Sequence, residues 1–218
     1  DSGARIDTAA VWGASGLPET AGRCTQEILE AAKNGELGAI VLGGVELADL
    51  PAGAQDALRN VFVVQLEVRE TETTALADVV LPVAPTSEKG GTFINWEGRL
   101  RPFGQTLVSK NLPDRRVLHD LAHEMGVDLG LGTLAEAVEE MAELRRWDGA
   151  RGQFADVEAS PAPAVGPGQA VLASWKQMID AGALLSHEPH LAKTARKPVA
   201  VMSAKTADDA GITGTVTV

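Results

Sequence analysis

At residues 77–99 the chain contains the run Ala77-Asp78-Val79-Val80-Leu81-Pro82 and, after a short spacer, the run Glu88-Lys89-Gly90-Gly91-Thr92-Phe93-Ile94-Asn95-Trp96-Glu97-Gly98-Arg99. The first run predicts a short buried strand, which ends at Pro82 because proline has no N–H for a strand ladder. The glycines of the second run predict a loop, since glycine adopts backbone conformations closed to other residues. Open α/β sheets usually place ligand sites in polar loops after a parallel strand, so residues 88–99 are a candidate site.

Upstream of these runs, short apolar segments alternate with helical patterns. This alternation predicts right-handed βαβ units and a parallel sheet. The expected elements are a helix from its N-cap Thr25 to about Asn34, a strand at 39–42 ending at Gly43-Gly44, a helix from Pro51 or Ala52, a strand at 61–66 and a helical turn at 71–76.

Downstream, the apolar period becomes helical. Pro113 predicts the start of one helix and Thr133 the cap of a second. Their apolar stripes, expected to face inward, are Val117, Leu118, Leu121 and Met125, then Leu134, Ala137, Val138, Met141 and Leu144. In the second helix an acidic, solvated stripe from Glu136 to Glu143 precedes Arg145 and Arg146, the order that a helix dipole favours.

The last third of the chain is divided by a segment rich in alanine, proline and glycine. We expect an α/β domain at 1–147, an extended linker at 148–168 and a second domain at 169–218. In that second domain the pattern predicts an amphipathic helix carrying Val171, Leu172, Trp175, Met178 and Ile179, a strand at 198–203, a short helix at 205–211 and a strand at 215–218.

Composition excludes several classes of function. A net charge of −11 over 218 residues argues against nucleic acid and anionic membrane surfaces as partners. No apolar run approaches the ~20 residues of a membrane span, so direct membrane insertion is not expected. The single cysteine, Cys24, excludes an internal disulfide and any cluster held by several thiolates.

Three further candidate sites favour structural interpretations. Gly43-Gly44 lacks the rest of a dinucleotide-binding pattern, which favours a tight turn. His119 and His123 have a spacing that metal sites use, but without an evident third ligand a polar helix face is preferred. Cys24 precedes a predicted helix N-terminus with no histidine close in sequence, so we interpret it as an ordinary small residue.

The runs at 77–82 and 88–99 resemble the signature loop of the molybdopterin oxidoreductase superfamily. Within it, flanking residues resemble the large iron–sulfur subunits of bacterial respiratory complex I, the NADH:quinone oxidoreductase. These residues are Val11-Trp12-Gly13, Leu17-Pro18, 35–39, 95–103 and 188–192. The resemblance runs along nearly the whole chain and implies that the chain corresponds to the C-terminal part of such a subunit.

This resemblance implies an α/β fold: a fragment of a parallel-sheet, Rossmann-like molybdopterin-oxidoreductase domain, followed by helices and the start of a small β-barrel domain. A vestigial pterin-pocket loop would contain Glu88, Gly91, Thr92, Asn95, Glu97, Gly98 and Arg99. The favoured interpretation is a self-supporting loop, in which Glu97 and Arg99 pair with each other or with nearby backbone and Asn95 bridges turns.

The implied function is structural support for electron transfer from NADH to quinone, with no catalytic, cofactor-binding or metal-binding residue in this part. The [4Fe-4S] and [2Fe-2S] clusters would lie in an N-terminal part outside this chain. The partners would be other peripheral-arm subunits, on the cytoplasmic side of the inner (plasma) membrane. Two alternatives are a fragment of a molybdenum or tungsten bis-pterin oxidoreductase, such as a formate dehydrogenase, and a free-standing Rossmann-type binding module.

Overall fold

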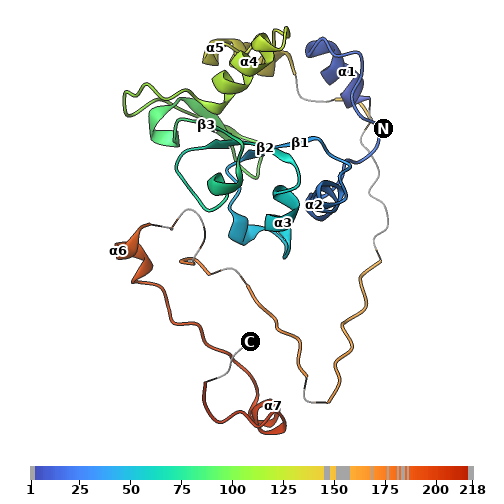
Figure 1. The fold of residues 1–218 in the computed structure, drawn as a ribbon, viewed down its shortest axis with the longest axis vertical. Coiled ribbons are helices and arrows are strands. Elements are labelled where there is room, and N and C mark those ends of the chain that lie inside the picture. The colour runs from blue at the N-terminus through green and yellow to red at the C-terminus, as the bar shows by residue number, and fades with distance from the viewer. Residues whose placement is uncertain are drawn as a thin grey trace. The chain divides into compact units, whose positions relative to one another are not determined.

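A computed structural model describes residues 3–144, 148–150, 158–167, 169–175, 177–180, 182, 185 and 187–215. The chain divides into two compact units between residues 153 and 154 (Figure 1). In the first unit the helices are α1 (Ala4–Val11), α2 (Thr25–Lys33), α3 (Ala54–Leu58), α4 (Asp114–Glu124) and α5 (Leu134–Glu143). Its strands are β1 (Ala39–Gly43), β2 (Phe62–Glu67), β3 (Val79–Pro82), β4 (Gly91–Ile94) and β5 (Leu100–Phe103), and its 3-10 turns are η1 (Leu47–Asp49), η2 (Thr74–Leu76) and η3 (Thr86–Glu88).

The centre of the first unit is a parallel sheet with the strand order β1-β2-β3. Val41, Val64 and Val79 lie in register and form one row across it. The predicted parallel sheet is therefore confirmed, with strand bounds within one residue of the expected ones for β2 and β3.

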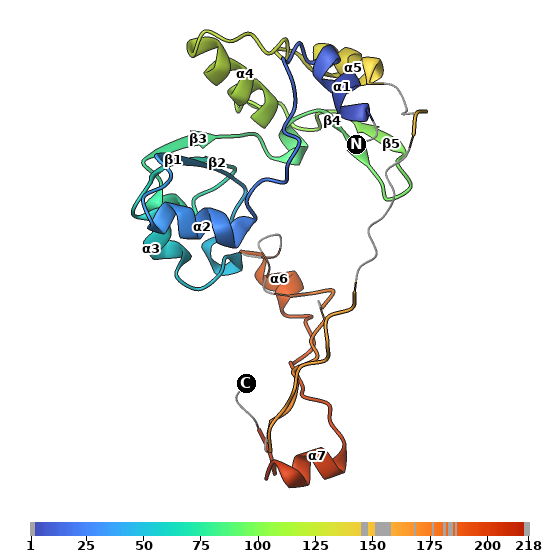
Figure 2. The same ribbon diagram turned by 90° about the vertical axis from the view of Figure 1, so that its right-hand side faces the viewer.

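Two helices cover one face of this sheet. Figure 2 shows α2 and α3 together on one side of β1 and β2. Their side chains join the strands in one apolar core, made of Ala32, Ile40, Ala57, Leu58, Val61 and Val63. This core holds β2 firmly in the middle of the sheet, because β2 has a paired strand on each side.

The prediction that residues 79–81 form a buried strand is wrong in its burial. Val79 and Val80 are exposed in β3, and Leu81 is half-buried. The physical reason is position: β3 is an edge strand. An apolar run predicts a strand but not the layers that cover it.

Two helix starts also differ from the prediction. The N-cap of α2 is Cys24 rather than Thr25, because the Glu27 carboxylate accepts a hydrogen bond from the Cys24 N–H at 2.7 Å. Helix α3 begins at Ala54, after Gly53, which takes a left-handed φ of 87° that Pro51 and Ala52 are poorly suited to.

The predicted loop at 88–99 is largely a hairpin. β4 and β5 pair antiparallel, with Phe93 opposite Arg101 and Ile94 opposite Leu100. The rings of Phe93 and Phe103 stack with centroids 4.7 Å apart. This stacking and the aromatic and β-branched residues of β4 favour a strand where the glycines had predicted a loop.

The helices at 113–125 and 133–144 form as predicted. Pro113 is the N-cap of α4, and Thr133 caps α5 by accepting a hydrogen bond from the Glu136 N–H at 3.2 Å. Their stripes do not face a core, since no residue of α4 or α5 is buried and Leu134, Val138 and Met141 are exposed. A helical period shows which side chains share a face, but it does not supply the element that covers them. Arg145 and Arg146 lie outside the described residues.

In the second unit the helices are α6 (Pro189–Ala192) and α7 (Ala204–Asp209), and α7 confirms the short helix predicted at 205–211. The helix predicted around 171–179 is wrong: residues 169–175 and 177–180 contain no helix. Apolar side chains of 170–175 instead line a pocket with residues 199–202, and Figure 2 shows the two extended segments side by side. A short isolated helix is marginal without a packing partner.

The strands predicted in the second unit are not confirmed. Residues 198–203 are irregular, and 216–218 lie outside the part of the chain that the structure describes, so the start of a β-barrel is not established. The linker predicted at 148–168 contains neither helix nor strand at 148–150 and 158–167. Among the described helices, none has the length and apolarity that a membrane crossing requires.

Candidate functional site

The tip of the β4–β5 hairpin is built around Asn95. Its side-chain oxygen accepts hydrogen bonds from the Glu97 N–H at 3.1 Å and the Arg99 N–H at 2.8 Å. Gly98 closes the turn with a φ of 77°. The Arg99 Nε lies 3.2 Å from a carboxylate oxygen of Glu97. These contacts confirm the expectation of a self-supporting loop, in which the polar groups bind one another.

Trp96 stands at the same tip with 95% of its surface exposed. The turn therefore presents a large aromatic ring to solvent, while its polar neighbours stay bound to the turn. The sequence pattern placed Trp96 only as an unspecified residue between Asn95 and Glu97.

Glu88 lies at the base of the hairpin and not with the tip residues. Hydrogen bonds from Ser109 and Asn111 lower the pKa of the Glu88 carboxyl. The Asn111 amide nitrogen donates at 2.8 Å. Next to it, Lys89 forms an ion pair with Asp114 at the start of α4. Glu88 and Lys89 thus fasten the hairpin to the segment that follows it.

Gly91 and Thr92 occupy β4, opposite Phe103 and Pro102. A Cβ added to Gly91 would stand 2.8 Å from the Phe103 ring. Gly91 is therefore required by the close approach of that ring rather than by an unusual backbone angle. Of the seven predicted loop residues, Asn95, Glu97, Gly98 and Arg99 lie together, and Glu88, Gly91 and Thr92 lie apart from them.

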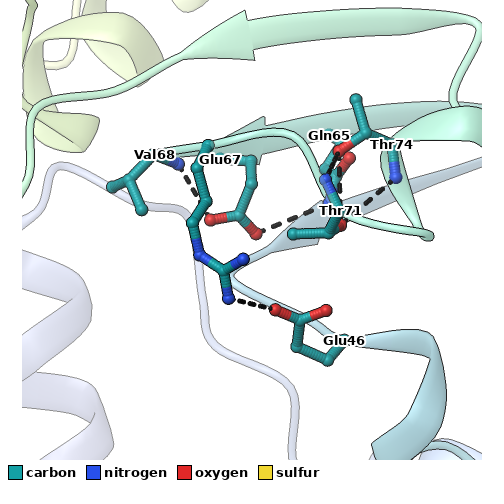
Figure 3. A network of polar contacts seen from close by, with 7 residues as sticks. Glu46, Gln65, Glu67, Val68, Thr71 and Thr74 are labelled. Atoms are coloured by element: carbon teal, nitrogen blue, oxygen red, sulfur yellow. Dashed lines mark hydrogen bonds and ion pairs between the residues drawn. The ribbon is translucent and has the colours of Figure 1, made fainter. Parts of the chain in front are cut away.

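A second polar cluster, absent from the sequence-based candidates, lies at the carboxyl end of β2 (Figure 3). Gln65 is fully buried and Glu67 nearly so. The Glu67 carboxylate accepts hydrogen bonds from the Val68 N–H at 2.8 Å and, at 3.5 Å, from the Gln65 amide. The signal for this cluster is the alternation Gln65-x-Glu67-x-Arg69, which places polar side chains on one face of an otherwise apolar strand.

Arg69 extends this cluster to the segment after β1. Its guanidinium donates to a Glu46 carboxylate oxygen at 2.8 Å, and both side chains are largely covered. Thr71 and Thr74 bind each other through side chains and backbone and shape the turn before β3. The ion pair therefore links the ends of β1 and β2, the edge where open parallel sheets usually bind ligands.

Two buried oxygens near the end of β2 have no hydrogen-bond partner in the structure: Oε1 of Gln65 and Oγ1 of Thr73. Buried polar atoms are normally paired with protein or with ordered water. These two atoms are therefore the positions in the first unit at which a bound water has the clearest physical role.

Asp78, the acidic residue of the first run, has a backbone role. Its carboxylate accepts a hydrogen bond from the Val63 N–H at 2.7 Å, and its own N–H donates to the Val63 carbonyl at 2.9 Å. Asp78 therefore joins the start of β3 to β2. The residues that carry the family resemblance hold the sheet together at this point.

The remaining candidates lie apart from these clusters. Gly44 takes a φ of 62° directly after β1, as a tight turn requires. The Nδ1 of His119 is buried, with Asp128 at 3.9 Å as its ion-pair partner, whereas His123 is exposed. Cys24 is exposed at the start of α2. Within the described ranges, no three His, Cys, Asp or Glu side chains are arranged to hold a metal.

The residues present do not fit the cofactors of the superfamily. An iron–sulfur cluster needs several thiolates, and Cys24 is the one cysteine of the 218 residues. A pterin would need free donors and acceptors from the hairpin. The side chains of Glu88, Asn95, Glu97 and Arg99 already bind protein groups.

Known proteins share much of this sequence. Residues 8–111 match the family model described as molybdopterin oxidoreductase. The G subunit of the NADH-quinone oxidoreductase of Mycobacterium tuberculosis is 43% identical over 97% of this chain and 27% of the relative. The corresponding subunit of Streptomyces coelicolor is 44% identical over 97% of this chain and 26% of the relative. A putative formate dehydrogenase of Staphylococcus haemolyticus is 32% identical over 59% of this chain and 14% of the relative.

The chain thus spans about a quarter of the length of the NADH-quinone oxidoreductase relatives. A match over 97% of the chain takes in both compact units. Residues 8–111, which contain the sheet and the hairpin, are therefore a molybdopterin oxidoreductase domain, in a chain that is similar over nearly its whole length to the G subunit of NADH-quinone oxidoreductase.

Proposed function

We propose that this chain is the structural C-terminal part of the large peripheral-arm subunit of a proton-pumping NADH-quinone oxidoreductase. The observation that carries the proposal is the extent of the similarity. The NADH-quinone oxidoreductase relatives match 97% of the chain at 43–44% identity, whereas the formate dehydrogenase relative matches 59% at 32%. The second compact unit thus has its counterpart mainly in the NADH-quinone oxidoreductase relatives.

In this role the chain supports electron transfer from NADH to quinone without carrying a redox centre. The single cysteine and the internally bound side chains of the hairpin support this assignment. The hairpin residues maintain the fold of the turn instead of holding a pterin. The [4Fe-4S] and [2Fe-2S] clusters would belong to a part of the parent subunit outside these 218 residues.

The partners in this proposal are other peripheral-arm subunits of the complex, on the cytoplasmic side of the inner (plasma) membrane. The exposed Trp96 is suited to such a contact, since tryptophan is enriched among the residues that dominate interface energies. The net charge of −11 makes nucleic acid an unfavourable partner.

A second candidate function is part of a molybdenum or tungsten bis-pterin oxidoreductase. The match of residues 8–111 to the molybdopterin oxidoreductase model and the similarity to a putative formate dehydrogenase favour it. It would require a metal ligand and a complete pterin site from residues outside this chain.

Elemental analysis of the purified full-length parent protein separates the two functions. It should be combined with a fluorescence assay for oxidised pterin released by denaturation. We expect iron without stoichiometric molybdenum, tungsten or pterin. Stoichiometric metal with pterin would instead establish the catalytic alternative and assign the hairpin to the wall of an active site.

A further inference from the structure

One face of the parallel sheet is apolar and uncovered. Alternate residues of β1, β2 and β3 point away from α2 and α3, and the register places Val41, Val64 and Val79 in one row on that side. Val41 is 59% exposed, Phe62 is 49% exposed and Val79 is 38% exposed. We call these four residues, Val41, Phe62, Val64 and Val79, the open face.

The connections between the strands explain why the open face is bare. The crossover from β1 to β2 contains α3, whereas the crossover from β2 to β3 contains only the turn η2. With the strand order β1-β2-β3, right-handed crossovers that all advance in one direction fall on the same face of a sheet. The open face therefore has to be covered by another segment.

Parallel sheets are almost always covered on both faces, usually by helices. The register rows of the open face contain alanine, phenylalanine, valine, glycine and leucine, with no charged residue. Such a surface fits the aliphatic stripe of an amphipathic helix. A second copy of the chain is a poorer occupant, because each copy has a net charge of −11.

We propose that the open face docks an amphipathic helix from the same parent polypeptide, contributed by a segment outside these 218 residues. This inference rests on the proposed function, in which the chain is part of a longer large subunit. The NADH-quinone oxidoreductase relatives extend well beyond the matched quarter of their length, which leaves ample chain for this helix. Covalent continuity also gives such a segment a high effective concentration at the sheet.

The test uses the isolated full-length parent subunit carrying the photo-crosslinking residue p-benzoyl-phenylalanine in place of Phe62. After irradiation and proteolysis, mass spectrometry should identify a cross-link within one polypeptide, to a residue outside the 218. The matched control carries the same probe in place of Phe93. This control should cross-link inside the hairpin, because the Phe93 ring stacks on Phe103.

Three results would overturn the inference: a cross-link from position 62 to a second copy, a cross-link that forms only when other subunits are added, or no cross-link. A second pair of variants guards against misfolding of the probe variant. Val41→Asp should lower the unfolding midpoint of the full-length subunit by several degrees, and Val41→Thr by much less. Equal, small shifts would mean that Val41 remains in water.

These measurements do not require the assembled complex. An intrachain cross-link in a parent protein that contains molybdenum and pterin would uphold the covered face and reject the proposed function. A parent with iron and no pterin, but without the cross-link, would do the reverse.

Discussion

At the scale of single residues, Asp78 has the most specific backbone contact in the first unit. We expect Asp78→Ala to lower the free energy of unfolding by about 1–2 kcal/mol, the range for a hydrogen bond to a charged acceptor that is partly solvated. Asp78→Asn should lose less, because its amide oxygen can still accept from the Val63 N–H. Hydrogen exchange of the Val63 amide reports the effect directly. Unchanged exchange in the alanine variant would remove Asp78 from this role.

Asn95 has a comparable role at the hairpin tip. Asn95→Ala removes the acceptor for two backbone N–H groups, those of Glu97 and Arg99. We expect faster amide exchange at both positions and a loss of about 1 kcal/mol in hairpin stability. Asn95→Asp keeps an acceptor oxygen and serves as the matched control. Equal exchange in the two variants would mean that the turn forms without this side chain.

At the scale of elements, the β4–β5 hairpin depends on the space above Gly91. Gly91→Ala would bring a methyl group against the Phe103 ring, and overpacking of this kind costs about 1–3 kcal/mol. Gly104→Ala is the control, since a Cβ at Gly104 meets no atom within 4 Å. Thermal unfolding of the two variants should differ clearly. The prediction fails if both lower the midpoint equally.

The N-terminus of α5 should be sensitive to acid. Hydrogen bonds from Thr133 lower the pKa of the Glu136 carboxyl below its usual 4.5. A lowered folded-state pKa stabilises the helix above the unfolded-state value, and this contribution is lost as the pH falls through the folded-state pKa. We expect α5 to fray below about pH 4.5, as seen in the exchange of the Thr133 amide.

Glu136→Gln separates charge from hydrogen bonding in this cap. Glutamine can still accept from the Thr133 N–H, so the cap should persist, but it should no longer weaken as the pH falls. The same acid profile in both proteins would assign the effect to other carboxyls, such as Glu27 at the start of α2, whose pKa is also lowered by its hydrogen bond from Cys24.

At the scale of the whole molecule, the two units differ in how much they bury. The first unit has an apolar core around β2, whereas no residue of the second unit is buried among those the structure describes. Folding must offset the loss of conformational entropy by burying surface. We therefore expect residues 1–153 alone to unfold cooperatively with urea, and 154–218 alone to show no cooperative transition by circular dichroism.

A sharp transition in the isolated second unit would contradict this expectation. It would mean that the extended segments at 170–175 and 199–202, which line one apolar pocket, form a core of their own. Loss of the transition in residues 1–153 would mean that the first unit depends on the second.

The sequence alone determined the local elements of the first unit. The runs at 39–42, 61–66 and 79–82 predicted its parallel strands, and Pro113 and Thr133 predicted the starts of α4 and α5, because periodicity and capping act over a few neighbouring residues. The run at 77–99 also identified the family, and the mutual binding of Asn95, Glu97 and Arg99 followed from residues close together in the chain.

Only the tertiary structure decided which surfaces are covered. It turned the expected loop into a hairpin through the contact of Phe93 with Phe103, and it placed Gln65, Glu67, Arg69 and Glu46 in one polar cluster. It also left β3, the stripes of α4 and α5 and the segment at 171–179 without the cover or helix that their patterns predicted. Local patterns specify a face of an element, whereas its partner comes from residues distant in sequence, which no local period encodes.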